Sequence, residues 1–155
     1  MQISVKILEQ KLNVFSGKEQ IKSYSISTSK YGIGNKAGSN KTPLGLHQIV
    51  SKIGKNAFPG TIFKRRRNTG KIARSSGGDF ITTRILRLAG LEKGINKGKG
   101  IDSFQRCIYI HGTPEENLIG KPASHGCIRM KNRDIIELFS MVKRGTLVQI
   151  ADQIS

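Results

Sequence analysis

Tryptophan is absent from this 155-residue chain, and aromatic residues make up only 6% of it. Proteins that bind single-stranded nucleic acid stack bases on aromatic side chains placed among basic residues. The basic run FKRRRNTGK, residues 63–71, offers a single phenylalanine for this purpose. Nucleic-acid binding is therefore not the expected main function, and this run is expected to be a solvated basic surface.

Cysteine is also scarce, since only Cys107 and Cys127 are present. Two cysteines exclude a disulfide framework, although a single bridge or two free thiols both stay open. A domain of this length buries roughly two-thirds of the surface of its unfolded chain, so it needs no bridge to fold. We expect one domain over residues 1–155, a monomer, and no cofactor or metal.

Long apolar runs are missing as well. No stretch reaches the ~20 apolar residues that a membrane-spanning helix needs, so no membrane span is expected. The N-terminal segment MQISVKILEQ has no continuous apolar core and no small-residue cleavage site, so it does not resemble a signal peptide. We expect a cytoplasmic protein if Met1 is the natural start, and a periplasmic or cell-wall protein if a leader precedes it.

Acidic residues are outnumbered: 10 Asp and Glu face 27 Lys and Arg, which gives a net charge of +17. A field of this sign attracts polyanions such as nucleic acid, an anionic membrane surface or an acidic polymer substrate. Charge alone does not choose among these partners.

The pattern of apolar residues predicts a mostly β fold. Alternation near the N-terminus predicts short strands. Residues 28–43 are rich in Gly, Ser, Asn and Lys and predict a loop, and residues 51–80 predict a long, basic, mobile surface insertion. Further strands are expected at 46–50, 79–88, 106–112 and 146–150. The alternating positions are Ile3, Val5 and Ile7, then Leu12 and Val14, then Tyr24 and Ile26.

One main helix is predicted near the C-terminus. Asn132 is the expected N-cap, Asp134 suits the first turn, and Gly145 is placed for a left-handed stop. The residues between them form an apolar stripe of helical period. Its members are Ile135, Ile136, Leu138, Phe139 and Val142.

Reactive side chains gather in the segment PASHGCIRM, residues 122–130. In the preceding strand CIYIHG, alternate residues share a face, so Cys107, Tyr109 and His111 point away from the apolar side. The connection GTPEENLIGKPA, residues 112–123, is rich in Pro and Gly and is expected to loop back. It would return Cys127 to the strand end that carries His111.

A cysteine beside a histidine has a definite chemical use. A free thiol has a pKa near ~8.5, and an imidazole can take its proton and later return it to a leaving amine. Backbone amides near Gly126 and Cys127 can donate to a tetrahedral oxyanion. Two other interpretations stay open: core packing of the two cysteines, and a zinc site. The zinc ligands would be His111, His125, Cys127 and Cys107.

These motifs resemble a known signature. IHG at 110–112 followed by SHGCIRM at 124–130 is similar to the signature of the YkuD-type L,D-transpeptidase catalytic domain, and TPLG at 42–45 resembles the family's upstream TPxG turn. The resemblance implies a mostly β, YkuD-like β-sandwich or mixed sheet, and a cysteine enzyme acting on peptidoglycan stem peptides or muropeptides. The acyl acceptor would be an amine, as in cross-linking, or water, as in the family's cytoplasmic L,D-carboxypeptidases.

The resemblance also implies roles for single residues. Cys127 would attack the bond between meso-diaminopimelate and D-alanine, with His111 as base, steadied by the Gly112 carbonyl. His125 and Gly126 would frame the oxyanion site. The remaining expected site residues are Ser124, with a structural role, Arg129, which would bind or orient substrate, and Tyr109 on the face of His111. The alternative to an enzyme is a non-catalytic basic module that binds wall polymer or nucleic acid.

Overall fold

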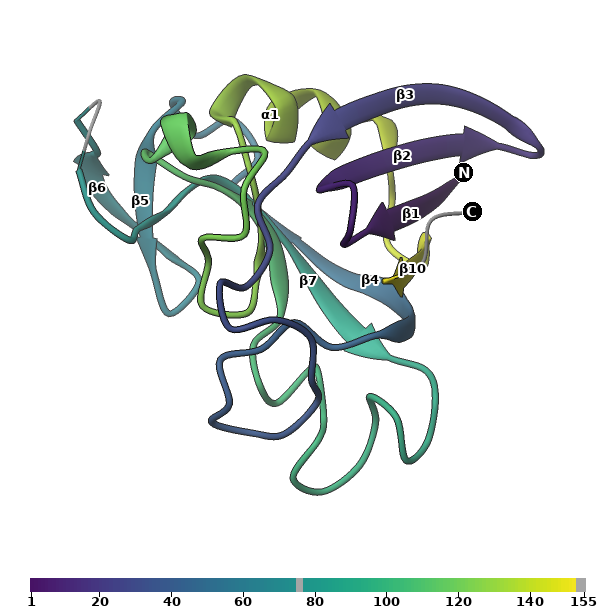
Figure 1. Ribbon diagram of the computed structural model, residues 1–155. Helices are drawn as coiled ribbons and strands as arrows, with labels where there is room; N and C mark the ends of the chain where they lie inside the picture. The colour runs from purple at the N-terminus through teal and green to yellow at the C-terminus, as the bar shows by residue number, and fades with distance from the viewer. Residues whose placement is uncertain (75–76, 153–155) are drawn as a thin grey trace.

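The computed structural model describes residues 1–74 and 77–152. It is built around one mixed sheet with the strand order β3-β2-β1-β10-β4-β7-β5-β6, to which β8 and β9 are attached through β7 (Figure 1). Strands dominate and one α-helix lies near the C-terminus, so the predicted fold class is confirmed. None of the helices in this described part is long and apolar enough to cross a membrane.

The N-terminal strands form a meander at one side of the sheet. β1 (Gln2–Lys6), β2 (Lys11–Ser16) and β3 (Glu19–Ser25) pair antiparallel in succession. The alternation seen in the sequence has its expected cause, because Ile3, Val5, Leu12 and Val14 are buried in the main core. β1 also pairs in parallel with β10 (Leu147–Ala151), the last strand among the described residues.

The middle of the sheet consists of two long antiparallel strands, β4 (Gly45–Ile53) and β7 (Ile81–Gly90). β5 (Thr61–Lys64) and β6 (Arg67–Ile72) form a hairpin that extends the sheet from β7. The sequence prediction of a loop over 51–80 is thus wrong for these strands. Their polar and charged residues hid the pattern because β6 is an exposed edge strand with no buried face; residues 75–76 of this stretch lie outside the described residues.

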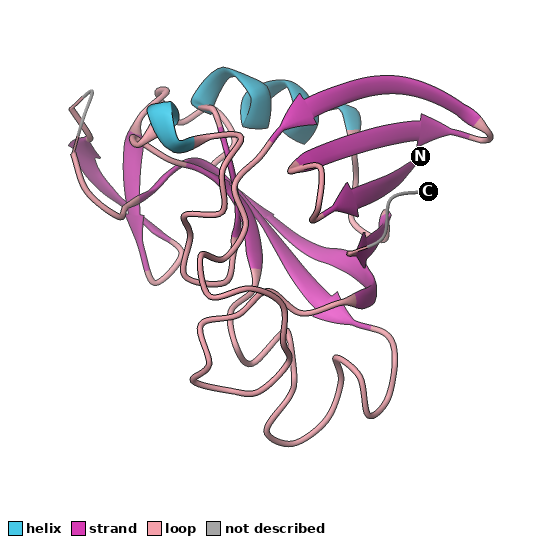
Figure 2. Ribbon diagram, in the orientation of Figure 1, coloured by secondary structure: helices cyan, strands magenta, loops and turns pink. Residues whose placement is uncertain are grey.

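Two short strands carry the reactive segments. β8 (Tyr109–Gly112) pairs antiparallel with β7 and parallel with β9 (Ile128–Met130), and the connection between them contains the 3₁₀ helix η1 (Glu116–Leu118). Below the sheet, the loops at 26–44 and 91–108 lie side by side (Figure 2), tied by a hydrogen bond from the Ala37 amide to the Gly100 carbonyl.

Helix α1 (Asn132–Met141) covers the core with three members of the predicted apolar stripe, Ile135, Leu138 and Phe139, which are buried. Val142 is its C-cap, so the helix ends before the predicted stop at Gly145. Its N-cap is Lys131, not the predicted Asn132. The Asn132 side chain is used elsewhere: its Oδ1 accepts hydrogen bonds from the hydroxyls of Thr82 and Thr83 in β7. The backbone N–H of Asn132 donates to the Glu116 carboxylate, at 2.7 Å.

Candidate active site

His111 stands on β8 with 4% of its surface exposed. Its Nδ1 lies 2.6 Å from the Gly112 carbonyl oxygen. Since a carbonyl can only accept, Nδ1 carries the proton and Nε2 keeps its lone pair. Burial lowers the pKa of His111 to about 4, against the opposing effect of the Gly112 carbonyl. The strand therefore holds a neutral imidazole that can take up a proton at Nε2.

Gly112 occupies a position where no larger residue fits. A Cβ at this position would lie 2.6 Å from Asn132 Oδ1 and 2.7 Å from the Thr82 carbonyl oxygen. The glycine thus lets β7 and the start of α1 press directly against the carbonyl that fixes the His111 ring. This part of the expected arrangement is present: the His111 ring and the Gly112 carbonyl are in contact.

Cys127 lies directly before β9, whose parallel register pairs Ile110 with Ile128 and His111 with Arg129. Cys127 is therefore opposite Tyr109 and one diagonal step from His111 on the same face of the strand pair. The Tyr109 amide donates to Cys127 Sγ at 3.3 Å, and the Cys127 thiol donates to the Cys107 carbonyl, also at 3.3 Å.

Cys107 has the left-handed backbone conformation, with φ of 58°, which is uncommon for a residue with a side chain. This conformation aims its carbonyl at the Cys127 thiol. Both cysteines are free, so the single bridge left open by the sequence is not formed.

The thiol and the imidazole are both neutral near pH 7 in the free protein. Burial raises the pKa of Cys127 to about 11, although the Tyr109 amide and the Arg106 guanidinium favour the thiolate. Burial lowers the pKa of His111, because it disfavours the charged imidazolium. The site therefore holds an uncharged pair, in which proton transfer from sulfur to nitrogen has to be driven by an arriving ligand.

Ser124 and Gly126 shape the turn before the cysteine. Ser124 is buried, its hydroxyl donates to the Cys127 carbonyl at 2.7 Å, and it accepts from the Gly126 amide at 3.2 Å. These bonds hold the turn that precedes Cys127. They also occupy the Gly126 amide, which leaves the Cys127 amide as the better oxyanion donor. Gly126 has φ of 126°, a conformation that favours glycine.

Thr42, from the TPLG turn, reaches the same turn from a distant part of the chain. Its hydroxyl donates to the Gly126 carbonyl at 2.9 Å and accepts from the Ser29 amide at 3.0 Å. Thr42 is fully buried, so both bonds are shielded from water. The role of this threonine was not singled out from the sequence, although the turn itself was.

Thr42→Val is expected to weaken the site without changing its shape. The substitution removes the hydroxyl, so the Gly126 carbonyl and the Ser29 amide lose their partner, at a cost of about 1–3 kcal/mol in stability. We expect acylation of Cys127 to slow by on the order of tenfold, because the turn that carries it is no longer fixed. Stopped-flow acylation and chemical unfolding measure both effects. Thr42→Ser keeps the hydroxyl and should stay close to wild type; an unchanged acylation rate in Thr42→Val would contradict this role.

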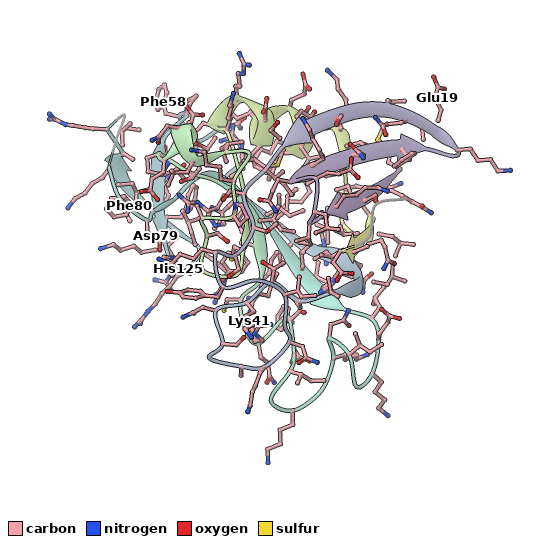
Figure 3. All side chains as sticks on the ribbon, in the orientation of Figure 1. Glu19, Lys41, Phe58, Asp79, Phe80 and His125 are labelled. Atoms are coloured by element: carbon pink, nitrogen blue, oxygen red, sulfur yellow. The ribbon has the colours of Figure 1, made fainter. Side chains whose placement is uncertain are left out.

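His125 lies more exposed than the other site residues, and Figure 3 shows it beside Asp79. Its Nδ1 is 2.9 Å from Asp79 Oδ2, and its ring is tilted against that of Tyr31 with 6.0 Å between centroids. Asp79 also acts electrostatically on His111 and Cys127, since it raises the pKa of each. Sequence reasoning missed Asp79 because it comes from the segment interpreted as an insertion.

Arg129 is placed differently from the expectation. Only 2% of its surface is exposed, and its guanidinium donates to the Ala123 carbonyl, the Thr113 hydroxyl and the Glu115 carboxylate. A buried, paired guanidinium fixes the connection between β8 and β9. In this structure Arg129 thus contacts groups of the protein itself, and its expected contact with substrate stays a prediction.

Tyr109 is also buried, with 4% exposed. Its hydroxyl accepts a hydrogen bond from Arg66 Nη1 at 2.9 Å, and Arg66 comes from the turn of the β5–β6 hairpin. The Tyr109 side chain thus connects the basic hairpin to the strand of His111 through its hydrogen bond with Arg66.

A cleft of about 510 Å³ opens at Cys127. His125 and Cys107 line it, together with Asn40, Asp102 and Arg106 from the two long loops. Within residues 1–74 and 77–152, no group of three or more His, Cys, Asp or Glu side chains could hold a metal ion. The zinc site left open by the sequence therefore has no ligand set in this part of the chain.

The comparisons with known proteins agree with this fold. The model of the YkuD family, described as the L,D-transpeptidase catalytic domain, matches residues 2–150. The chain therefore belongs to the YkuD family of L,D-transpeptidase catalytic domains.

Curated relatives are similar to this chain over short segments. The protein named L,D-transpeptidase YkuD of Bacillus licheniformis is 58% identical over 41 residues, which is 26% of this chain and 25% of its own length. The protein named L,D-transpeptidase YqjB of Bacillus subtilis is 46% identical over 54 residues, covering 35% of this chain and 30% of its own. These matched segments thus span less than a third of each relative.

Solved structures share the fold at low identity. An L,D-transpeptidase from Mycobacterium smegmatis superposes with a TM-score of 0.58 at 18% identity, covering 97% of this chain and 58% of its own. An L,D-transpeptidase from Stackebrandtia nassauensis gives 0.57 at 19% identity, covering 98% of this chain and 55% of its own. The fold is shared almost over the whole chain, which spans a little over half of these structures.

Proposed function

We propose that this protein cleaves the bond between the L-centre of the third residue, meso-diaminopimelate or an equivalent, and the terminal D-alanine of peptidoglycan stem tetrapeptides. The observation that carries the proposal is the thiol of Cys127 on the same strand-pair face as the fixed, neutral imidazole of His111, at the edge of an open cleft. Peptidoglycan is the substrate class consistent with the family.

Acylation would proceed by attack of the thiol and then loss of D-alanine. Cys127 Sγ attacks the carbonyl carbon of the third residue while its proton passes to His111 Nε2, and the carbonyl oxygen becomes an oxyanion near the Cys127 amide. The carbon–nitrogen bond then breaks, the nitrogen takes the proton from His111, and D-alanine leaves. A thioester on Cys127 remains.

Deacylation uses the same base. An amine or a water molecule attacks the thioester carbonyl, His111 accepts the proton of the attacking group, and Cys127 leaves and recovers its proton. An amine gives a cross-link or an exchanged residue, whereas water gives a tripeptide, as in an L,D-carboxypeptidase. The neutral resting pair supports both outcomes, because His111 needs a free lone pair for either acceptor.

A product assay tests the proposal. Incubating the protein with a disaccharide tetrapeptide, with and without an excess of an amino acid acceptor, should release D-alanine, detected by mass spectrometry. Tripeptide as the product indicates water as the acceptor, and an exchanged or cross-linked product indicates an amine. The absence of D-alanine release under both conditions would overturn the proposal.

The second candidate function is a non-catalytic module that binds wall polymer through charge. The turn of the β5–β6 hairpin favours it, since Lys64, Arg65, Arg66 and Arg67 together line a cleft of about 610 Å³. This module would bind anionic polymer with a steep salt dependence and would form no adduct on Cys127 with a carbapenem. Stoichiometric acylation of Cys127 would exclude it as the sole function.

A further inference from the structure

We infer that Arg106 binds a carboxylate of the acyl donor, which makes it a specificity-determining residue for the function proposed above. Arg106 lies in the loop before β8 and lines the same cleft as Cys127. It was not among the site residues expected from the sequence. The inference rests on the proposed function for its substrate but on the geometry of the cleft for its chemistry.

The guanidinium of Arg106 is held in place by the loop opposite. Its Nη2 donates to the Lys41 carbonyl at 2.6 Å and its Nη1 donates to the Gly34 carbonyl at 3.3 Å. Lys41 precedes Thr42, the residue that fixes Gly126, so the cation is built into the frame of the reactive turn. Neutral carbonyls orient the guanidinium without neutralising its charge.

No carboxylate of the described residues compensates this cation. None of the ion pairs within residues 1–74 and 77–152 includes Arg106. The acid that shares the cleft, Asp102, is engaged by backbone amides, from Gly98 to its Oδ1 and from Gln105 to its Oδ2, each at 3.0 Å. A fixed cation without an acid partner, in a cleft beside a thiol, is matched by an anion that arrives with the ligand.

Desolvation agrees with the geometry. Burial lowers the pKa of Arg106, and the electrostatic interaction with the Cys127 thiolate opposes this shift. The guanidinium is thus partly stripped of water and electrostatically coupled to the sulfur, and a carboxylate bound there would lie close to the reacting carbonyl. Two carboxylates of a stem tetrapeptide belong to the residues on either side of the scissile bond: the terminal one on D-alanine and the side-chain one on meso-diaminopimelate.

Binding to an inactive protein separates the inference from the chemistry. We propose to measure, by calorimetry on Cys127→Ala, the dissociation constants of three tetrapeptides: the natural acid, its C-terminal amide, and a form with L-lysine in place of meso-diaminopimelate. We expect the natural peptide to bind on the order of tenfold more tightly than the peptide that lacks the recognised carboxylate. The Cys127→Ala/Arg106→Gln double variant should lose that preference and bind all three alike.

The outcomes divide cleanly. A preference that survives Arg106→Gln, or equal binding of all three peptides by Cys127→Ala, would overturn the inference. Arg144→Gln, which removes the same charge at an exposed position, is the matched control and should keep the preference. A carboxylate preference that depends on Arg106, combined with no D-alanine release by the wild type, would overturn the proposed function and leave the recognition site standing.

Discussion

Cys127→Ala should abolish release of D-alanine from a tetrapeptide, with a loss on the order of 10⁴-fold or more, because the thioester cannot form without the sulfur. Acylation gives a second measurement. A carbapenem should add one equivalent of mass to the wild type, located on Cys127 by peptide mapping, and nothing to the variant.

Cys107→Ala is the matched control for this prediction. Cys107 contacts the Cys127 thiol through its backbone carbonyl, which alanine retains, so the adduct should still form on Cys127. An adduct on Cys107 in the wild type, or turnover by Cys127→Ala, would show that Cys127 is not the reacting thiol. Equal unfolding free energies of the variants and the wild type, within about 1 kcal/mol, would show that the comparison reports chemistry and not folding.

His111→Gln should slow acylation by about 10²–10⁴-fold while leaving tetrapeptide binding within a few-fold of wild type. Glutamine can still contact the Gly112 carbonyl through its amide but cannot accept the thiol proton. Single-turnover acylation, with the dissociation constant measured separately, distinguishes lost proton transfer from lost binding. A proportionate loss of both would instead indicate that His111 only maintains the shape of the cleft.

The acid stability of this variant is a further readout. The native pKa of about 4 lies below the ordinary value of 6.5, so the unfolded chain binds more protons between these values. The stability of the wild type therefore falls as the pH falls through this window, by roughly 2–3 kcal/mol at pH 4 from this histidine alone. His111→Gln should remove that part of the decline in urea unfolding measured at pH 7 and pH 4.

His47 provides the matched control, because it is a second buried histidine outside the cleft. Its ring contacts the Gly45 carbonyl and the Ser103 hydroxyl, and burial lowers its pKa as well. His47→Gln should also flatten the acid decline, yet acylate at a rate within about threefold of wild type per folded molecule. A large loss of acylation in this control would mean that any buried histidine supports the rate.

The features predicted from the sequence are those that depend on local pattern. The alternation of apolar and polar residues along β1 and β2, and the apolar stripe on α1, follow from burial of one face. The order of residue types along the chain is therefore enough to predict them. The contact between the His111 ring and the Gly112 carbonyl follows from adjacent positions in the chain. The placement of Cys127 beside β8 follows from one returning loop.

The features that were missed depend on long-range contacts. Thr42 contacts Gly126, Asp79 contacts His125 and Arg106 lines the cleft. These three residues come from separate loops, and their roles arise only when those loops are brought together. Arg129 was expected to bind or orient substrate because the resemblance to the family implied that role. In the structure its guanidinium pairs with the half-buried carboxylate of Glu115, and no sequence pattern predicts that pairing.

The position of β10 has a consequence for the order of folding. The sheet order places β10 between β1 and β4, so the first three strands are joined to the rest of the sheet through the last five-residue strand alone. During synthesis, the N-terminal meander lacks its partner on that side until β10 has been made. Closure of the sheet therefore depends on a pairing between residues far apart in the chain, and such pairings slow folding.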